Sequence, residues 1–117
     1  DLPPEEGGEL EEFTRQYGLS LVYLLAPTST EERIREVAGR ASGFIYLVSL
    51  TGVTGPRKSL SFDLKRNIKI IKEYTDKPVC VGFGVSQRAQ IRDINKVADG
   101  VIVGSAIIRI INMKLLF

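Results

Sequence analysis

The stretch FIYLVSLTGVTG, at residues 44–55, contains the pattern that decides the fold. It opens with a continuous apolar run at residues 44–48 and passes into a glycine-rich segment at residues 51–61. A short, unbroken apolar run predicts a strand that is buried on both faces, as in a parallel sheet. Apolar residues then recur at helical spacing between residues 64 and 74, so the stretch predicts a strand, a loop and a helix in that order.

The same cycle recurs on both sides of this stretch. Further strands are predicted at residues 21–26, 79–82 and 101–103, and helices around residues 10–17, 34–41, 91–98 and 107–117. Ser86 is the predicted cap of the helix around residues 91–98, and Glu11 and Arg15, one turn apart in the first helix, are expected to pair weakly. Strict alternation of helices with buried strands is typical of a parallel sheet with right-handed crossovers. Two architectures have this pattern: a doubly wound sheet, which fits the length, and a (β/α)8 barrel. A complete barrel needs about 250 residues, so this chain could form only part of one.

The composition excludes several kinds of site. The 117 residues include no histidine and a single cysteine, which rules out imidazole general bases, His-ligated zinc and an intrachain disulfide. A net charge of +2 is too small to indicate nucleic-acid binding. No apolar stretch approaches the roughly 20 residues of a membrane span, and no signal peptide is visible. We expect a globular chain in a reducing compartment, with no metal, nucleic-acid or membrane partner.

The chain begins at Asp1 without an initiator methionine, so we expect that it starts partway into something larger and that residues 1–117 are a single partial domain. Charge is uneven along it. Residues 1–12 hold six acids and no base, and residues 57–77 hold seven bases against three acids. We interpret both runs as solvated helix faces. The alternative for the second run is a cationic rim that attracts an anionic ligand.

The carboxyl ends of the predicted strands are rich in glycine and small hydroxyl residues. In either architecture ligands bind at these ends. Glycine lets a phosphate approach backbone N–H groups closely, and the helix N-termini that follow favour an anion. One such loop is ordinarily a tight turn, but GFG at residues 82–84 and GSA at residues 104–106 lie on neighbouring strands and together favour a phosphate site. The remainder of a dinucleotide-binding fingerprint is missing after Gly82.

These motifs resemble the tryptophan synthase alpha chain family. FIYLVSLTGVTG at residues 44–55 is similar to its strand 6, PVCVGFGVS at 78–86 to its strand 7, and ADGVIVGSAI at 98–107 to its strand 8. LLAPTS at residues 24–29 and DLP at residues 1–3 resemble the ends of its strands 5 and 4. The resemblance covers nearly the whole chain in order. It implies an α/β fold of parallel (β/α) units, the C-terminal half of a TIM (β/α)8 barrel.

The family cleaves indole-3-glycerol phosphate to indole and glyceraldehyde 3-phosphate by a retro-aldol reaction, within L-tryptophan biosynthesis. The resemblance implies that this chain uses no cofactor of its own and passes indole to a tryptophan synthase beta chain, which holds pyridoxal phosphate. It also implies a cytoplasmic location, or the plastid stroma in a plant or alga.

The resemblance assigns roles to individual residues. It places the substrate phosphate against Gly52, Val53, Gly82, Phe83, Gly84, Gly104 and Ser105. It places the hydroxyl of Tyr46 beside the reacting substrate, and makes Thr54 a lid residue that orients a catalytic carboxylate. The loop at residues 51–61 would be the lid. Without the resemblance, Tyr46 would be read as a core residue, as we read Cys80 in the middle of its strand.

One departure from the family concerns the catalytic acids. The family's two catalytic carboxylates lie on and just after strand 2, which this chain lacks, and Asp99 precedes the last strand, at the wrong end. We therefore expect the chain to supply the phosphate site and the lid, and to be inactive alone. Half a barrel leaves open strand edges, which would pair with a missing N-terminal half or with a second copy. One alternative is another phosphate-binding barrel, such as a sugar-phosphate isomerase or epimerase, but the GVTG motif argues against it. The other is a non-catalytic half-barrel.

Overall fold

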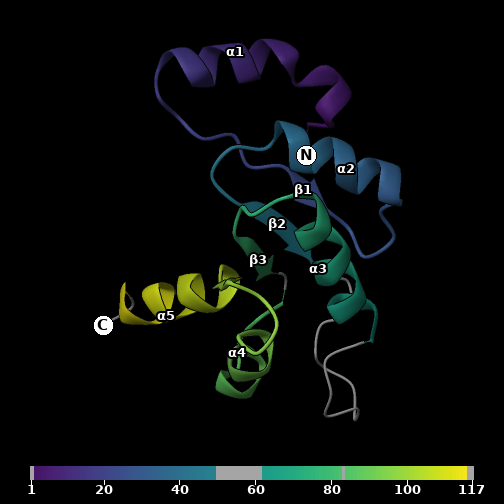
Figure 1. Ribbon diagram of the computed structural model, residues 1–117. Coiled ribbons are helices and arrows are strands. Elements are labelled where there is room, and N and C mark those ends of the chain that lie inside the picture. Colours follow the sequence, from purple (N-terminus) through teal and green to yellow (C-terminus); the bar gives the residue numbers. More distant parts are fainter. Residues whose placement is uncertain (1, 50–61, 83, 116–117) are drawn as a thin grey trace.

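The structure is a computed structural model that describes residues 2–49, 62–82 and 84–115. Helices and strands alternate along these residues (Figure 1). The elements are η1 (Pro4–Glu6), α1 (Gly8–Gln16), β1 (Leu24–Leu25), α2 (Glu31–Arg40), β2 (Ile45–Val48), α3 (Phe62–Tyr74), β3 (Val79–Gly82), α4 (Arg88–Ile94), β4 (Gly100–Ile102) and α5 (Ser105–Leu115).

The four strands form one parallel sheet in the order β1-β2-β3-β4. Each strand therefore lies beside its neighbours in the sequence. A doubly wound sheet reverses its strand order at a switch point, and the described strands show no such reversal. The observed order is the one found along the wall of a (β/α)8 barrel. The doubly wound alternative is thus excluded.

One face of the sheet is covered by helices and carries the core. Successive side chains of a strand point to opposite faces, so Ile45 and Leu47 of β2 share a face, and they are almost completely buried. The same cluster contains side chains from all three crossover helices: Ile34, Val37 and Ala38 of α2, Leu64, Ile68 and Ile71 of α3, and Ile94 of α4. These three helices therefore pack on the same side of the sheet.

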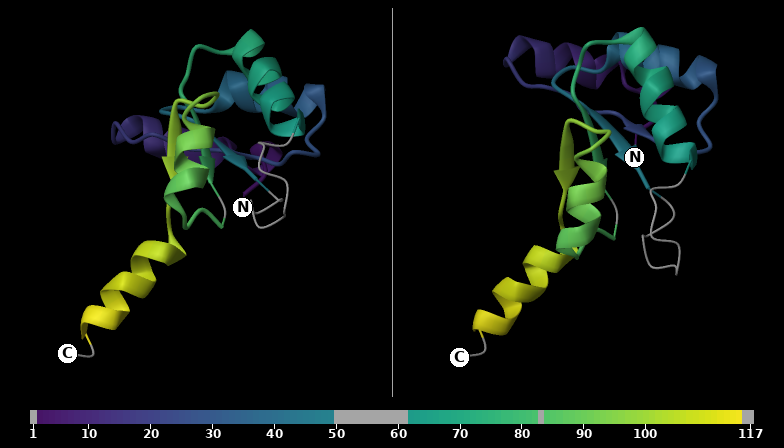
Figure 2. Two further views of the ribbon diagram at one scale, coloured as in Figure 1. Left: turned by 90° about the horizontal axis from the view of Figure 1, so that it is seen from below. Right: turned by 60° about the horizontal axis from the view of Figure 1, so that its bottom comes forward.

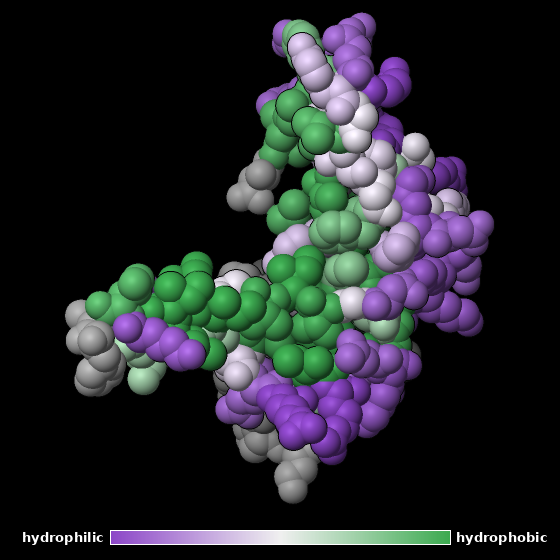
Figure 3. Space-filling model, turned by 90° about the vertical axis from the view of Figure 1, so that its left-hand side faces the viewer, coloured by the Kyte–Doolittle hydropathy of each residue, from purple (hydrophilic) through white to green (hydrophobic). Residues whose placement is uncertain are grey.

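The opposite face of the sheet, which we call the open face, carries a different set of residues. Leu24, Tyr46, Cys80 and Gly100 lie side by side in register across the four strands. Leu24 is 43% exposed, although it belongs to a strand. Space-filling atoms show an apolar surface that continues from the body of the molecule onto α5 (Figure 3).

Three predicted boundaries are wrong by one or more residues. The strand predicted at residues 21–26 is regular only at Leu24–Leu25, because its first half bonds to the turn before β2. The Leu21 N–H donates to Ser42 Oγ, and the Ser42 N–H donates to the Leu21 carbonyl. The last strand begins one residue early, at Gly100. Helix α4 is capped by Gln87 rather than by the predicted Ser86.

Helix α2 forms where an N-terminal cap is followed by apolar residues at helical spacing. Thr30 caps its N-terminus, and the Thr30 hydroxyl accepts a hydrogen bond from the Arg33 N–H over 3.3 Å. Ile34, Val37 and Ala38 then recur at helical spacing and are buried. Capping of this kind is worth about 1 kcal/mol, and the burial of the apolar stripe fixes which side of α2 faces the sheet.

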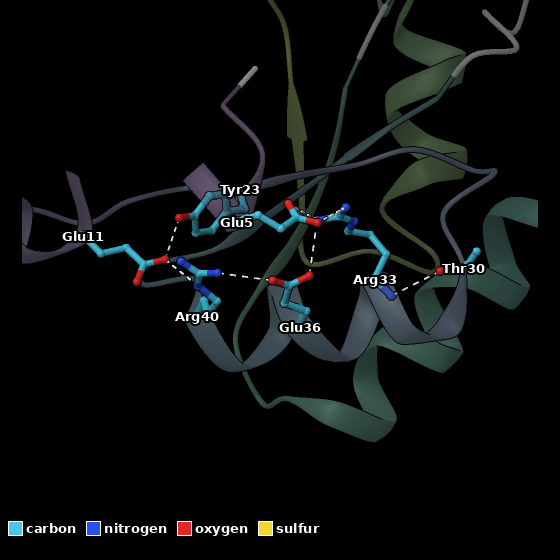
Figure 4. Close-up of polar contacts among 7 residues, drawn as sticks. All are labelled: Glu5, Glu11, Tyr23, Thr30, Arg33, Glu36 and Arg40. Atoms are coloured by element: carbon cyan, nitrogen blue, oxygen red, sulfur yellow. Dashed lines mark hydrogen bonds and ion pairs between the residues drawn. The ribbon is translucent and has the colours of Figure 1, made fainter. Parts of the chain in front are cut away.

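A chain of ion pairs ties η1 to α2 (Figure 4). Both guanidinium nitrogens of Arg33 donate to the Glu5 carboxylate, and Arg33 also reaches Glu36 over 3.2 Å. The Arg33 hydrogen bonds lower the pKa of Glu5 to about 2. Glu36 in turn accepts from Arg40, one turn further along α2.

The same network holds α1 through Glu11 (Figure 4). The Glu11 carboxylate accepts from the buried Tyr23 hydroxyl over 2.5 Å and from Arg40 Nε over 2.8 Å. The hydrogen bond from Tyr23 lowers the pKa of Glu11, while burial and Glu11 raise the pKa of Tyr23 to about 12. The acidic run at residues 1–12 is therefore only partly the solvated face that we predicted. Two of its six acids face arginines of α2.

Helix α5, like α1, has no buried residue. It extends away from the sheet and from the crossover helices in both views of Figure 2. Its apolar residues are about half exposed or more: Ile107, Ile108, Ile110, Ile111, Met113 and Leu115. The sequence predicted a very apolar helix or tail here, and the structure shows a helix whose apolar side chains meet no core.

Candidate functional site

The carboxyl ends of the strands bring the predicted loops together. Val48, Gly82 and Ile102 are register partners at the ends of β2, β3 and β4. Just beyond β2, the Ser49 N–H donates to the Gly82 carbonyl over 2.9 Å. The segments that follow these strands therefore start from adjacent points on one edge of the sheet. This is the edge at which parallel sheets bind ligands.

Gly82 provides the space that Tyr46 occupies. A Cβ atom at residue 82 would lie 2.5 Å from the Tyr46 hydroxyl oxygen and 2.8 Å from the Cβ of Ile102. Both distances are too short for non-bonded atoms. The tyrosine ring thus leans along the open face toward the carboxyl end of β3, and only glycine at residue 82 lets it do so. Tyr46 is half-buried in this position.

Gly84 and Gly104 lie just after β3 and β4 and differ from each other. Gly84 has a φ of +65°, a conformation that side chains with a Cβ rarely adopt. Gly104 precedes α5, and its carbonyl accepts from the N–H groups of Ile107 and Ile108. No atom of the described residues lies within 4 Å of a Cβ built at Gly104. The space beside it is therefore open.

The N-terminus of α5 completes this edge of the sheet. Ser105 is its first residue, and the first N–H groups of a helix have no carbonyl partner within the helix. Such groups, together with the helix dipole, favour an anion. The Ile107 and Ile108 N–H groups bond to the Gly104 carbonyl, which leaves those of Ser105 and Ala106 as donors at the start of α5, just after Ile102, the register partner of Gly82. This arrangement suits a phosphate group better than a cation.

Several predicted site residues lie outside the described residues. These are Gly52, Val53, Thr54 and Phe83, together with the whole of the predicted lid at residues 51–61. Their roles stay predictions. The described members of the predicted site are Tyr46, Gly82, Gly84, Gly104 and Ser105, and they belong to β2, to β3, to the segments after β3 and β4 or to the start of α5.

Two described carboxylates are held by partners outside the candidate site. Asp99 lies at the amino end of β4, where it pairs with Lys72 and accepts from the Val79 N–H over 2.8 Å. The Lys72 ammonium lowers the pKa of Asp99, which keeps it ionised. Glu31, at the start of α2, accepts from the Tyr74 hydroxyl, and the Tyr74 ring also lies 5.2 Å from the Arg35 guanidinium.

Cys80 is not the fully buried core residue that we predicted. It is half-buried on the open face, and a Cβ at Gly100 would lie 2.9 Å from its sulfur. Burial raises the pKa of the Cys80 thiol. A thiol with a raised pKa is a poor nucleophile at neutral pH. Cys80 therefore fills the open face beside Tyr46 without offering chemistry of its own.

Asn67 is a polar residue whose role the sequence does not reveal. It is buried on α3, and its amide Nδ2 donates to the Pro27 carbonyl over 2.8 Å. This bond fixes α3 to the loop after β1, at the same edge of the sheet as the candidate site. A lone asparagine within a basic helix gives no signal of such a contact in the sequence.

The described ranges contain no cluster of three metal-ligating side chains. No described helix combines the length and the apolar character that crossing a bilayer requires.

Comparison with known proteins identifies the family. The family model for the tryptophan synthase alpha chain matches residues 1–115. The chain belongs to the tryptophan synthase alpha chain family. It is 44% identical over 115 residues to the alpha chain of Methanocaldococcus jannaschii and 52% identical over 109 residues to that of Geotalea daltonii. These alignments include 98% and 93% of this chain but 41% of each relative.

Solved structures give the same family. A structure from Aquifex aeolicus VF5 aligns with a TM-score of 0.78 at 44% identity, over 93% of this chain and 40% of that one. The tryptophan synthase a2b2 complex of Pyrococcus furiosus aligns with a TM-score of 0.82 at 37% identity, over 97% of this chain and 46% of that one. The predicted fold, a parallel α/β half of a (β/α)8 barrel, is confirmed.

Proposed function

We propose that this chain is the phosphate-binding part of a carbon–carbon lyase, the alpha subunit of tryptophan synthase, which cleaves indole-3-glycerol phosphate to indole and glyceraldehyde 3-phosphate. One observation carries the proposal beyond family membership. The carboxyl ends of β2, β3 and β4 meet at one edge of the sheet, beside the N-terminus of α5. That edge offers backbone donors and open space, which a phosphate monoester requires.

In this proposal the glycines and Ser105 hold the substrate phosphate, and Tyr46 lies beside the part of the substrate that reacts. Gly104 leaves room for the phosphate because no described residue comes within 4 Å of a Cβ built there. Ser105 contributes its hydroxyl and the start of α5. The contact with Gly82 holds the Tyr46 hydroxyl at the carboxyl end of the sheet. Gly52, Val53 and Phe83 complete the phosphate site, and Thr54 orients a catalytic carboxylate from the lid.

Cleavage of the carbon–carbon bond needs proton transfers that these residues do not provide. An acid must protonate the indole ring, and a carboxylate must assist the loss of the indole N–H proton. The described carboxylates that make ion pairs lie on helices or at the amino end of the sheet. We therefore propose that the catalytic carboxylates come from a part of the barrel that this chain does not contain.

The chain spans about two fifths of the length of the relatives it matches. The proposed partners are a segment that completes the barrel and a beta chain that receives indole and holds pyridoxal phosphate. This chain holds no cofactor in the proposal. The aligned Pyrococcus furiosus protein forms an a2b2 complex, which supports the second partner.

Measuring indole release from indole-3-glycerol phosphate tests the proposal. The chain alone is expected to release indole at a rate lower by about 10²–10⁴-fold for each missing proton-transfer group. Adding a polypeptide that carries the first four strands of a related alpha chain is expected to restore turnover. In the restored enzyme Tyr46→Phe lowers turnover, whereas Cys80→Ala acts mainly on stability.

Turnover by the isolated chain close to that of the restored pair would place the catalytic acid within these 117 residues. Failure of any added first half to restore activity, while the chain still binds glycerol phosphate, would support the non-catalytic half-barrel instead.

A further inference from the structure

Asn67 occupies a position of α3 at which the helical spacing calls for an apolar residue. Leu64, Ile68 and Ile71 recur at that spacing in the core, and Asn67 lies among them on the same side of α3, where it is 8% exposed. Burying an amide costs free energy unless the amide is hydrogen-bonded, and an apolar side chain would fill the position without that cost. Asn67 is therefore placed there for its hydrogen bond rather than for packing.

The hydrogen bond of Asn67 reaches a backbone group that is itself fixed. Its Nδ2 donates to the Pro27 carbonyl over 2.8 Å, between residues 40 positions apart in the chain. Pro27 belongs to a closed turn between β1 and α2. In this turn the Ala26 N–H donates to Ser29 Oγ, and the Ser29 N–H donates to the Ala26 carbonyl, each over 3.0 Å. Asn67 therefore binds to a rigid point at the carboxyl end of the sheet.

Polar contacts hold α3 near its start and near its end. Asn67 makes the contact with Pro27 near the start. Near the end, Lys72 pairs with Asp99 at the amino end of the sheet, and the Tyr74 hydroxyl donates to α2. Apolar contacts have no preferred direction, so the core side chains of α3 tolerate a small shift along the helix axis. Hydrogen bonds and ion pairs are directional, and they fix one position of the helix.

The stretch between β2 and α3 is attached to a fixed point on each side. Just after β2, the Ser49 N–H is bonded to β3 over 2.9 Å. Residues 50–61 then lead to α3, which begins five residues before Asn67. This stretch contains Gly52 and Val53, which the proposed function assigns to the phosphate. A shift of the start of α3 changes the distance that the stretch has to span.

We propose that Asn67 is a positioning residue for the phosphate site: its hydrogen bond to Pro27 fixes the start of α3 relative to the loop after β1, and full affinity for a phosphate monoester depends on that position. The inference rests on the proposed function, which places Gly52 and Val53 against the phosphate. Asn67 touches no substrate in this account and acts through α3. Displacements of about 1 Å far from the chemistry are enough to impair a site.

Glycerol phosphate titrated into the labelled chain tests the inference, with the amide NMR signals of Gly84 and Gly104 giving the dissociation constant. Asn67→Leu keeps a side chain of similar shape but loses the donor. We expect its dissociation constant to rise at least about fivefold. Its urea midpoint is expected to stay close to that of the unaltered chain, because the gain in apolar burial offsets the loss of a donor for the Pro27 carbonyl.

Lys72→Met is the matched control, because it removes a polar contact from the same helix at the amino end of the sheet. It is expected to lower the urea midpoint and to leave the dissociation constant unchanged. Hydrogen exchange provides a measurement that needs no ligand. We expect the amides of residues 66–69, near the start of α3, to exchange faster in Asn67→Leu and at the unaltered rate in Lys72→Met.

Three results would overturn the inference and leave the proposed function standing. They are equal affinity of Asn67→Leu and the unaltered chain, an equal loss of affinity in Lys72→Met, and a loss of affinity in Asn67→Leu without faster exchange in α3. Failure of the unaltered chain to bind glycerol phosphate would contradict the proposed function, and the inference would fall with it.

Discussion

The two faces of the sheet are made of the same four strands but have different roles. On the covered face, branched aliphatic side chains such as Ile45 and Val79 are completely buried under α2, α3 and α4. On the open face the register row contains a tyrosine, a thiol and a glycine. The covered face therefore provides the stability of the fold, and the open face is free to carry residues chosen for size and polarity. Stability and site are separated by the alternation of the strands.

Truncating one leucine on each face should give the largest difference in stability between the two faces. Leu47→Ala, on the covered face, is expected to lower the free energy of unfolding by about 2–5 kcal/mol, because it opens a cavity in a packed core. Leu24→Ala removes the same atoms from the open face and is expected to cost less than about 1 kcal/mol in the monomer. Urea unfolding at low protein concentration measures both. Equal losses would mean that the open face is packed as well as the covered one.

A methyl group at residue 82 should disturb the open face in a particular way. Gly82→Ala is expected to cost about 1–3 kcal/mol, because the new Cβ overlaps the Tyr46 hydroxyl and Ile102. Gly104→Ala is the matched control, and because its space is empty we expect a change within about 0.5 kcal/mol. Combining Gly82→Ala with Tyr46→Ala tests the cause. If Tyr46 is the obstacle, the double variant loses less than the sum of the two single variants.

The polar network between α1 and α2 should contribute less than the core. Tyr23→Phe removes the hydroxyl that donates to Glu11, and it is expected to cost about 1–2 kcal/mol. Tyr17→Phe, on the exposed side of the same region, should change nothing measurable. Thermal unfolding of both variants gives the comparison. A neutral Tyr23→Phe would show that the Glu11–Arg40 pair alone holds α1.

The same network predicts how stability depends on pH. The pKa of Glu5 falls to about 2 in the folded chain from an ordinary value of 4.5. The unfolded chain therefore binds more protons as acid is added, so stability is lost as the pH falls from about 4.5 to about 2. The pKa of Tyr23 is raised to about 12, so stability is also lost as the pH rises from about 10 to about 12. Unfolding free energies across both windows check this. In Tyr23→Phe the alkaline loss should shrink.

The alternation of apolar runs and helical spacing was enough to predict the parallel sheet and the position of every described strand. The ends of the elements were harder, because they depend on contacts between distant residues. Ser42 binds Leu21 and so shortens β1, and the sequence holds no local signal for that bond. Gln90 accepts from the N–H groups of Ser86 and Gln87, which moves the start of α4 by one residue.

The candidate site was predictable only in part. The glycine-rich strand ends and the resemblance to the family indicated which residues gather at the carboxyl edge. They did not indicate that Gly82 is required by the ring of Tyr46, because that requirement comes from packing across two strands. The partner of Glu11 was also predictable only in part. Arg15, one turn away on α1, was the expected partner, whereas Arg40 from α2 makes the contact.

The central claim is that a phosphate binds at the carboxyl edge of the sheet, beside the start of α5. Calorimetric titration of glycerol phosphate into the chain and into Gly104→Asp tests it most directly. A side chain at residue 104 meets no atom of the described chain, so the variant is expected to fold normally. We predict weak binding to the unaltered chain and none to Gly104→Asp, because the new carboxylate occupies the space of the phosphate and repels it. Equal affinity for both would contradict the claim and place the phosphate elsewhere.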